Sequence, residues 1–393
     1  MPDFMLNIPK VILFLESSRQ YGRDLINGIA EYSLINGPWT FYKEDDFYST
    51  LKKGSGDLSW IKRWGANGII TRDFKGFDRL LEFKLPIIVV EAFQETNKVG
   101  NVPKVVSNHD AIGGLACDYF IRHGFKNFAY CGFTDMPWSV SRGERFASAL
   151  KSKGYQPEFF YSKSYRLLVW DKEYPRLVRW LTSLPRPAAI LCCNDDRGCD
   201  VIEACKTAGL RVPFDIAVLG IDDDPQVCNL TYPPLSSIML STKKAGFLTA
   251  QMLHELMRKE QVAENTIKVE PVGIDTRQST DSLAIEDPQV AKAMEFISAN
   301  SNPLIQVTDV LYHVGCSRRG LDEKFHKILG HSIFAEIRRI RIEMICNMLL
   351  KTNRSISEIA LALGYNDADH IARFFKQEKH MTPFEYRKTY ASS

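Results

Sequence analysis

Short apolar runs alternate with amphipathic, helix-compatible segments through the first 280 residues of the chain. The runs are rich in Val, Ile and aromatic residues, which favour strands, and the segments between them repeat apolar residues at helical spacing. A succession of this kind predicts an α/β fold with two doubly wound parallel sheets. We expect strands at residues 10–16, 39–43, 67–71, 86–91, 104–107, 127–132, 158–162, 188–193 and 215–222, and helices at 111–123, 142–153 and 196–208.

The last hundred residues carry a different pattern, and they carry it twice. A short amphipathic helix, a glycine turn and a second helix surround Gly315, and the same arrangement surrounds Gly364, 49 residues later. Apolar positions recur in step, for example Phe325 with Phe375. Two helices joined by a short turn are the plan of a helix-turn-helix, so the pattern predicts an all-α domain with two DNA-reading units in tandem.

Capping residues mark the helix boundaries in this C-terminal part. Asp287-Pro288 begins a helix that Asn302-Pro303 is expected to end, and capping boxes occur at residues 355–358 and 382–385. Between the two units, one continuous helix is predicted by the apolar positions Ile333, Ile337, Ile340, Met344 and Met348. Such a helix of about 20 residues spans about 30 Å, close to one turn of DNA, so the two reading helices are expected to enter successive major grooves.

Composition narrows the class of protein. The 393 residues, 45% of them apolar, are enough for two or three domains. The N-terminal apolar run is too short for a membrane span and no signal peptide accompanies it, so we expect a cytoplasmic protein. Nine scattered cysteines without a C-x-x-C pair indicate reduced core side chains. Residues 288–393 hold 15 Lys and Arg against 11 Asp and Glu, which favours a phosphate-bearing partner for this segment.

Polar side chains follow most of the predicted strands. In doubly wound sheets, ligands bind at the carboxyl ends of the strands, so the residues just after each strand are candidate ligand contacts. An indole and an arginine near residue 140 join them. The candidates are Glu16, Ser17, Asp73, Glu91, Asn108, Trp138, Arg142, Asn194, Asp195, Asp222 and Asp223. These residue types suit catalysis, a metal or a hydroxyl-rich sugar; alternatively, they simply cap helices or meet solvent.

Part of the α/β region resembles a known family. The segment VLGIDDDPQVCNLTYPPLSSIMLSTKKAG is similar to the lactose and galactose repressors, which share the fold of periplasmic sugar-binding proteins. CNDDRG and SRGERFASAL match two further motifs of that family. The resemblance implies a two-lobed sensor in which Asp222, Asn194, Asp195 and Arg142 contact the ligand.

The C-terminal part resembles a second family. The signature GYNDADHIARFFKQEKHMTPFEYRK is similar to the DNA-binding domain of arabinose-type (AraC) regulators. We therefore expect a sensor over 1–280, a linker over 281–287 and a DNA-binding domain over 288–393. Within the sensor, lobe 1 should comprise roughly 8–107 and 240–266, and lobe 2 roughly 108–239 and 267–280.

Helical periodicity assigns candidate base-reading residues to the second helix of each unit. The inward stripes are Leu321, Phe325 and Ile328 in the first unit, and Ile371, Phe374 and Phe375 in the second. The outward candidates are Arg318, Arg319, Asp322, Glu323 and His326, and then Ala368, Asp369, Ala372, Arg373 and Lys376. Arginine suits guanine and alanine a thymine methyl, while the acidic residues are expected to orient the arginines. Since the two sets differ, the two half-sites should differ.

The joint architecture resembles the regulators of pentose operons along essentially the whole chain. That resemblance implies a sugar-responsive activator of pentose uptake and catabolism genes, with D-xylose as ligand. Its partners would be double-stranded DNA, a second copy in a homodimer and RNA polymerase, with no cofactor, metal or catalytic residue. A regulator of another ligand, such as arabinose or a non-sugar, and a repressor stay open as alternatives.

Two other classes of protein compete with a regulator. An enzyme could use the aspartates, but the chain lacks the P-loop, G-x-G-x-x-G, G-x-S-x-G and H-E-x-x-H motifs. A secreted solute-binding protein would share the two-lobed fold but is disfavoured by the missing signal peptide and by the duplicated helical pattern. The sequence therefore favours a regulator over both.

Overall fold

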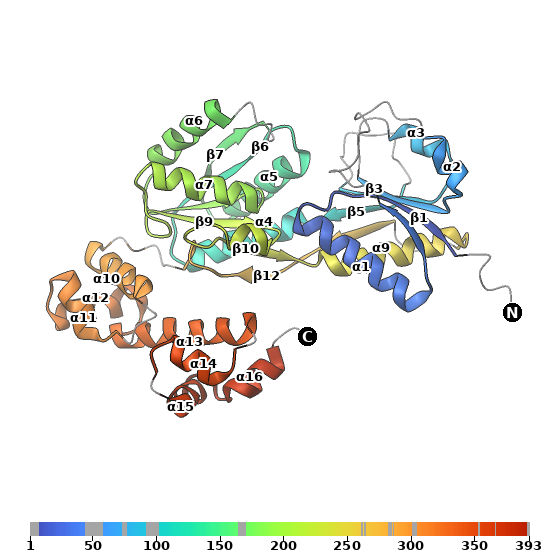
Figure 1. Cartoon of the computed structure of the whole chain (residues 1–393). Helices are drawn as coiled ribbons and strands as arrows, with labels where there is room; N and C mark the ends of the chain where they lie inside the picture. Colours follow the sequence, from blue (N-terminus) through green and yellow to red (C-terminus); the bar gives the residue numbers. More distant parts are fainter. Residues whose placement is uncertain are drawn as a thin grey trace. The chain divides into compact units, whose positions relative to one another are not determined.

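The computed structural model describes residues 8–43, 58–72, 77–91, 102–163, 170–260, 262, 265–281, 285, 287–300, 305–352, 354–365 and 367–390. The chain forms two compact units, Met1–Leu283 and Ala284–Ser393. Figure 1 shows the first unit as strands interleaved with helices and the second as helices. The predicted fold class, an α/β sensor followed by a helical domain with two helix-turn-helix units, is confirmed.

The first unit contains two six-stranded sheets. The strands of the first sheet run parallel in the order β11-β5-β4-β3-β1-β2. The second sheet has the order β12-β10-β9-β8-β6-β7, and its edge strand β12 runs antiparallel to β10. The strands are β1 (Lys10–Phe14), β2 (Thr40–Lys43), β3 (Gly68–Arg72), β4 (Ile87–Val90), β5 (Lys104–Ser107), β6 (Asn127–Phe133), β7 (Pro157–Ser162), β8 (Ala188–Cys192), β9 (Ile216–Ile221), β10 (Ser236–Leu240), β11 (Thr266–Val269) and β12 (Pro271–Asp275).

All nine predicted strands are present, with ends shifted by one or two residues. Three strands, β10, β11 and β12, were not predicted. Strand β10 begins with Ser236 and Ser237, which are fully buried because their hydroxyls are hydrogen bonded. Strands β11 and β12 are short edge strands, and β12 begins at a proline, which an edge position tolerates.

Helices pack on both sheets. They are α1 (Gln20–Asn36), α2 (Trp60–Trp64), α3 (Asp78–Leu81), α4 (His109–Arg122), α5 (Pro137–Ser152), α6 (Trp170–Ser183), α7 (Asp195–Thr207), α8 (Pro225–Cys228) and α9 (Thr242–Met257). Helices α1 and α9 lie side by side (Figure 1). Two glycines allow this approach, since a Cβ on Gly28 would lie 1.9 Å from Lys243 O and one on Gly246 would lie 2.1 Å from Leu25 O.

Three predicted helices are confirmed, and one of them starts earlier than expected. Helix α5 begins at Pro137 rather than at residue 142, because proline is well suited to the first turn, where its missing N–H costs nothing. This extension places Trp138 and Arg142 on one helix, one turn apart. Both candidate ligand residues therefore share a rigid element.

The chain passes between the two sheets three times. It crosses from β5 into α4, from β10 into α9 and from β11 into β12. Because β11 pairs with β5, the first sheet continues to Val269. The chain was expected to pass back into lobe 2 slightly earlier, near residue 267. Three segments of the chain therefore join the two lobes. A sensor whose lobes move about a hinge has this connectivity.

Each lobe has its own apolar core. The first lobe packs α1 and α9 on β1, β3, β4 and β5 through residues such as Val11, Leu25 and Leu253. The second lobe has a core around β6, β8 and β9 that includes Cys131, Cys192, Cys205 and Cys228. Seven of the nine cysteines are buried, in agreement with the expectation of core side chains.

The second unit consists of α10 (Pro288–Ala299), α11 (Val307–Val314), α12 (Arg318–Leu329), α13 (Ile333–Lys351), α14 (Ile356–Ala362), α15 (Ala368–Lys379) and α16 (Pro383–Tyr390). Helices α11 and α12 form the first helix-turn-helix, and α14 and α15 form the second. Both turn glycines have a left-handed backbone, with φ of 78° at Gly315 and 76° at Gly364, which allows the sharp turn.

The predicted capping residues are confirmed. Asp287 caps α10 by accepting hydrogen bonds from two backbone N–H groups, and both capping boxes are formed, at residues 355–358 and 382–385. Helix α10 ends at Ala299, before the expected stop at Asn302-Pro303, whose residues lie outside the described part of the chain.

Helix α13 is the predicted continuous connection, but its apolar stripe is not straight. The first half buries Ile333, Ile337 and Ile340, as expected. The second half instead buries Ile342, Ile345, Cys346 and Leu349, with Met344 and Met348 only partly covered. The buried face turns because the second half packs into the core of the second helix-turn-helix, on a different side from α12.

Candidate functional site

Two side chains of the first lobe donate to the carboxylate of Glu91, which follows β4. Tyr21 Oη donates a hydrogen bond to Glu91 Oε1 at 2.7 Å, and Ser107 Oγ donates to the same oxygen at 2.6 Å. Burial and the neighbouring carboxylate raise the pKa of Tyr21 well above its usual value, so its phenol remains a donor. Glu91 has a φ of 53°, a left-handed conformation that is uncommon for such a residue and recurs at functional sites.

Arg142 of α5 organises the facing part of the second lobe. Its side chain is only 4% exposed, Nη1 donates to Cys193 O at 2.5 Å, and Nη2 donates to Asp222 Oδ1 at 3.1 Å. The guanidinium lies over the ring of Trp138, 5.1 Å from its centroid. Within the described residues, Nε has no hydrogen-bond partner although it is buried. Arg142 thus keeps at least its Nε–H to offer.

Charges of the first lobe act on these groups of the second. Burial lowers the pKa of Arg142, but the carboxylates of Asp222 and Glu91 outweigh it and raise the pKa. Burial raises the pKa of Asp222, against the opposing effect of Arg142 and of Arg72 at the end of β3. Glu91 and Arg72 lie at the carboxyl ends of strands of the first sheet, so charged groups at the carboxyl ends of the two sheets lie close enough to act on one another. We call the polar region between these groups the cleft.

His109 lies at the crossing between the lobes, as the first residue of α4. Burial and the nearby Arg142 lower the pKa of His109 to about 4, so the imidazole is neutral at pH 7. Its Nδ1 is buried and finds no hydrogen-bond partner among the described residues. His109 therefore presents an unused ring nitrogen beside the cleft.

The structure adds Tyr21, Arg72 and His109 to the residues that the sequence singled out. Arg72 precedes the candidate Asp73, which lies outside the described residues, and His109 follows the candidate Asn108. In both places the expectation that residues just after a strand contact the ligand pointed to the right strand, but to the residue next to the one in the cluster. Tyr21 lies near the start of α1, 70 residues before its partner Glu91, and no local signal in the sequence marks it.

Three further predicted ligand residues have polar atoms that already bind protein partners. Asn108 caps α4 and donates from its amide to Glu270, and Asn194 caps α7. Asp195 is 3% exposed, and its two oxygens accept hydrogen bonds from Ser237 Oγ and from the backbone N–H of Asp224. Burial raises the pKa of Asp195 well above its usual value. These residues follow predicted strands, as ligand contacts would. Their polar atoms cap helices α4 and α7 or, in Asp195, bind Ser237 and Asp224.

The remaining described candidates are Glu16, Ser17 and Asp223. Glu16 accepts a hydrogen bond from the backbone N–H of Ser18, and Ser17 is half-buried between them. Asp223 pairs with Arg277 at 2.8 Å, so its carboxylate is already engaged. The residues that the structure brings together are therefore Tyr21, Arg72, Glu91, His109, Trp138, Arg142 and Asp222.

In the first helix-turn-helix, the outward face of α12 carries most of the predicted side chains. Arg318, Arg319, Glu323 and His326 are exposed. Arg319 pairs with Glu323 at 2.9 Å, as expected for an acidic residue that orients an arginine. Asp322 departs from the expectation, because its carboxylate accepts a hydrogen bond from the N–H of Ile333 at the start of α13.

One apolar assignment in α12 is also corrected. Ile328 was assigned to the inward stripe, but its side chain is 39% exposed, whereas Leu321 and Phe325 are fully buried. The domain core covers Leu321 and Phe325 of α12 but not Ile328. The exposed end of α12 is therefore partly apolar.

The outward face of α15, in the second helix-turn-helix, is simpler. Asp369, Arg373 and Lys376 are exposed, with the small residues Ala368 and Ala372 half-buried beside them. Arg373 Nε donates to the backbone oxygen of Asp369 at 3.3 Å. The two reading faces therefore share a frame and differ in side chains.

The arginines of α13 make contacts within the second unit. Arg338 pairs with Glu378 and lies over the rings of Phe334 and Phe374, while Arg339 pairs with Glu336 at 2.7 Å. Arg341 Nη2 donates to the backbone oxygen of Ile305. Arg338 therefore links α13 to α15 and Arg341 links α13 to the segment before α11, while Arg339 pairs within α13.

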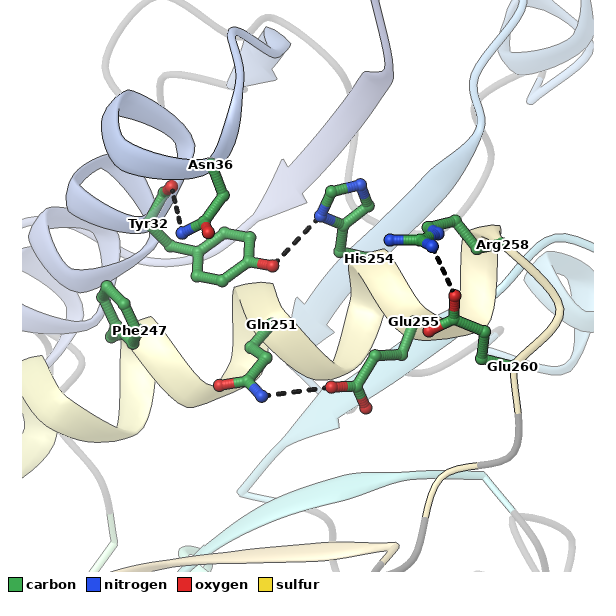
Figure 2. A pocket seen from close by; sticks show the side chains of 8 residues that line it. All are labelled: Tyr32, Asn36, Phe247, Gln251, His254, Glu255, Arg258 and Glu260. Carbon is green, nitrogen blue, oxygen red and sulfur yellow. Dashed lines mark hydrogen bonds and ion pairs between the residues drawn. The ribbon is translucent and has the colours of Figure 1, made fainter.

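A surface pocket of about 300 Å³ lies elsewhere, on the outer side of the first lobe between α1 and α9 (Figure 2). Its polar groups already bind one another: Tyr32 Oη lies 3.0 Å from His254 Nδ1, Gln251 donates to Glu255, and Arg258 pairs with Glu260. Pairing of this kind leaves few groups for a ligand. The cleft between the sheets is therefore the better candidate.

Metal binding and membrane insertion find no support in the described residues. No group of three or more His, Cys, Asp or Glu side chains among them has the arrangement of a metal site. Nor does this part of the chain contain a helix of the length and apolarity that a bilayer crossing needs.

Comparison with known proteins agrees with this architecture. Residues 117–280 match the model of a periplasmic binding protein-like domain, and residues 312–389 match that of a helix-turn-helix domain. A sensor joined to a helix-turn-helix domain defines a transcription regulator.

Particular relatives extend over nearly the whole chain. It is 28% identical to the xylose operon regulatory protein of Haemophilus influenzae, over 96% of this chain and 98% of that protein. Identity to the xylose operon regulatory protein of Escherichia coli K12 is 27%, over 96% of both. The structure of a xylose-binding transcription activator superposes with a TM-score of 0.77 at 25% identity, covering 98% of this chain and all of that one.

Proposed function

We propose that this chain is a sugar-responsive, sequence-specific transcription regulator that binds D-xylose in the cleft between its sensor lobes. Its targets would be genes for pentose uptake and catabolism, which it activates as a homodimer in contact with RNA polymerase. The similar regulators of xylose operons support this choice of sugar and of genes.

The observation that carries the proposal is the facing pair of polar groups across the cleft. Glu91 offers acceptors from the first lobe, and Arg142 with Asp222 offers donors and acceptors from the second. A sugar presents hydroxyls that both donate and accept, and the half-buried indole of Trp138 suits the apolar face of a pyranose. Binding to both lobes at once favours their closed form, because a ligand shifts an equilibrium only by its differential affinity.

Calorimetric titration of the full chain with D-xylose, L-arabinose, D-ribose and D-glucose tests the ligand. We expect D-xylose to bind most tightly. Arg142→Gln should weaken binding about 10- to 150-fold, because a charge-assisted hydrogen bond contributes about 1.5–3 kcal/mol. The matched control is Arg145→Gln on the same helix, whose half-exposed side chain pairs with Asp110 and should leave binding unchanged.

The outcomes separate the alternatives. Tightest binding to another monosaccharide would keep the class of ligand and change the sugar. Failure of all four sugars to bind would overturn the sugar proposal and leave a regulator of a non-sugar ligand. Equal loss in both variants would contradict the assignment of Arg142.

For the DNA-binding unit, we propose that α12 and α15 read two different half-sites about one turn of DNA apart. Helix α13 has 19 residues, a length of about 28 Å, and it connects the two helix-turn-helix motifs. Selection of duplexes from a random pool by the full chain, followed by footprinting, should give two unlike protected blocks spaced by about 10 base pairs. One block, or two identical blocks, would contradict the proposal.

A further inference from the structure

Three consecutive aspartates follow β9, and each meets an arginine from a different part of the sensor unit. Asp222 pairs with Arg142 of α5 at 3.1 Å. Asp223 pairs with Arg277, which follows β12, at 2.8 Å. Asp224 pairs with Arg23 of α1, in the other lobe, at 2.7 Å. The turn thus touches the ligand cleft, the chain leaving the sensor and the opposite lobe. Its three partners are 80, 54 and 201 residues away in sequence.

The backbone of this turn is held in an uncommon conformation. Asp222 has a φ of 105° and Asp223 a φ of 51°, both in the region that favours glycine. The N–H of Asp223 donates to Ser237 Oγ at 3.0 Å, and the N–H of Asp224 donates to the buried Asp195 at 2.7 Å. Strained residues persist where their surroundings hold them, and they recur at switches and ligand clamps.

The first outward connection of the turn is to the opposite lobe. Asp224 is 2% exposed and accepts hydrogen bonds from the backbone N–H of Gln20 at 3.1 Å and from Arg23 Nη2. A second ion pair beside it joins Arg19 to Asp196 at 2.6 Å. The start of α1 therefore docks on the second lobe next to the ligand aspartate, and these contacts stabilise the approach of the two lobes.

The second connection is to the segment that leaves the sensor. Arg277 is 8% exposed, and besides Asp223 it pairs with Asp275 and donates to Leu235 O at 2.8 Å. The residues after it are fastened to β9 and β10. Ser279 Oγ donates to Val218 O at 2.6 Å and accepts from the N–H of Ser236 at 2.7 Å. The first unit ends four residues beyond Ser279.

We infer that Arg277 is a positioning residue that transmits the state of the cleft to the segment leading to the DNA-binding unit. Sugar at Asp222 and docking of α1 at Asp224 both act on the same three-residue turn. A rigid turn passes any displacement on to Arg277, and through it to residues 276–280. This inference rests on the proposed sugar response, since it states how that response leaves the sensor.

The test measures coupling separately from binding, in the full chain. D-xylose affinity is measured by calorimetry, and affinity for a duplex selected by the wild-type chain is measured with and without D-xylose. In Arg277→Gln we expect sugar affinity within about threefold of wild type, because Arg277 lies outside the cleft cluster. The sugar-induced change in DNA affinity should fall at least fivefold; couplings of this kind are typically about 5- to 150-fold.

Two further variants make the result specific. Arg277→Lys keeps the charge but cannot reach Asp223, Asp275 and Leu235 O together, so its sugar response should lie between those of wild type and Arg277→Gln. Arg211→Gln removes an exposed arginine of the same lobe, paired with Asp215 at 2.9 Å, and should keep the full response.

An unchanged response in Arg277→Gln overturns this inference alone. Loss of sugar binding in both Arg277 variants also overturns it, because Arg277 would then build the pocket rather than relay its state. A wild-type chain that binds no sugar overturns the proposed function and this inference with it. The calorimetric titration of the wild type distinguishes that case from the other two.

Discussion

The second lobe of the sensor and the outward faces of α12 and α15 hold arginines in opposite ways. In the second lobe of the sensor, Arg142 and Arg197 are almost fully buried, and each is ion-paired to a carboxylate. On the reading helices, the side chain of Arg319 is 91% exposed, and Arg318 and Arg373 are also exposed. A buried, paired arginine has one geometry, which suits a small ligand that must be surrounded. An exposed one keeps its hydration and its reach until a large polyanion arrives.

Burial alone does not make an arginine a ligand contact, as Arg197 shows. It pairs with Glu173 at 2.7 Å and with Asp200 at 3.3 Å, and its guanidinium lies over the rings of Phe133 and Phe160. Its hydrogen-bonding groups thus face protein partners, whereas Arg142 keeps one buried donor unused. Burial raises the pKa of Asp200 to about 6 even though Arg197 opposes this. Arg197 therefore joins α6 to α7 and has a structural task.

The largest effect on stability should come from Arg197→Met. Removing the cation leaves Glu173 and Asp200 buried without it, which typically costs about 3–5 kcal/mol. The control Arg211→Met breaks an exposed pair and should cost less than about 1 kcal/mol. Urea unfolding of both variants measures the difference. Similar costs would show that burial does not distinguish the two pairs.

A smaller effect, on a different property, is expected for Arg373→Ala. The exposed side chain supports no core, so stability should change by less than about 0.5 kcal/mol. Affinity for the selected duplex should fall by about 1–3 kcal/mol, with sugar affinity unchanged. The matched control is Lys388→Ala on α16, which removes one charge away from α15. Gel-shift titration of both variants measures their affinity for the duplex. If Lys388→Ala lowered that affinity more than Arg373→Ala, the assignment of the reading face would be wrong.

A third effect concerns the pH dependence of sensor stability. The folded chain lowers the pKa of His109 to about 4 through burial and Arg142, against about 6.5 when unfolded. Below pH 6.5 the unfolded chain takes up a proton that the folded chain does not accept until about pH 4. Stability should therefore fall as the pH drops through this window, and His109→Gln should flatten the fall.

Urea midpoints at pH 7, 6 and 5 measure the effect of His109. His326→Gln on α12, where the histidine is exposed, serves as the control and should keep the wild-type profile. A steep profile that survives in His109→Gln would assign the dependence to other groups of the sensor.

Local patterns predicted the elements of this protein well. Nine strands, the tandem helix-turn-helix units and their caps follow from residues close together in sequence, because periodicity and capping act over a few residues. The errors occur where packing overrides a local pattern. Ile328 has helical spacing but no core to cover it, and the buried face of α13 turns to meet a second core.

The candidate site was predicted in outline only. Glu91 and Asp222 were chosen because they follow strands, and Arg142 because it lies on a helix beside Trp138; the structure brings all three into one cluster. The expectation that ligand contacts follow strands also chose Asn108, Asn194 and Asp195, because a residue that caps a helix and one that meets a ligand look alike in sequence. Tyr21 was not found, since its partner Glu91 is 70 residues away and nothing local links them.

The sequence by itself determined nine of the twelve described strands, the two kinds of domain and the difference between the outward faces of α12 and α15. Only the tertiary structure decided which arginine each aspartate of the turn after β9 pairs with. An aspartate and an arginine carry no mark of their partner, and these pairs form across 54 to 201 residues of chain. Their choice depends on burial and geometry that exist once both sheets have folded.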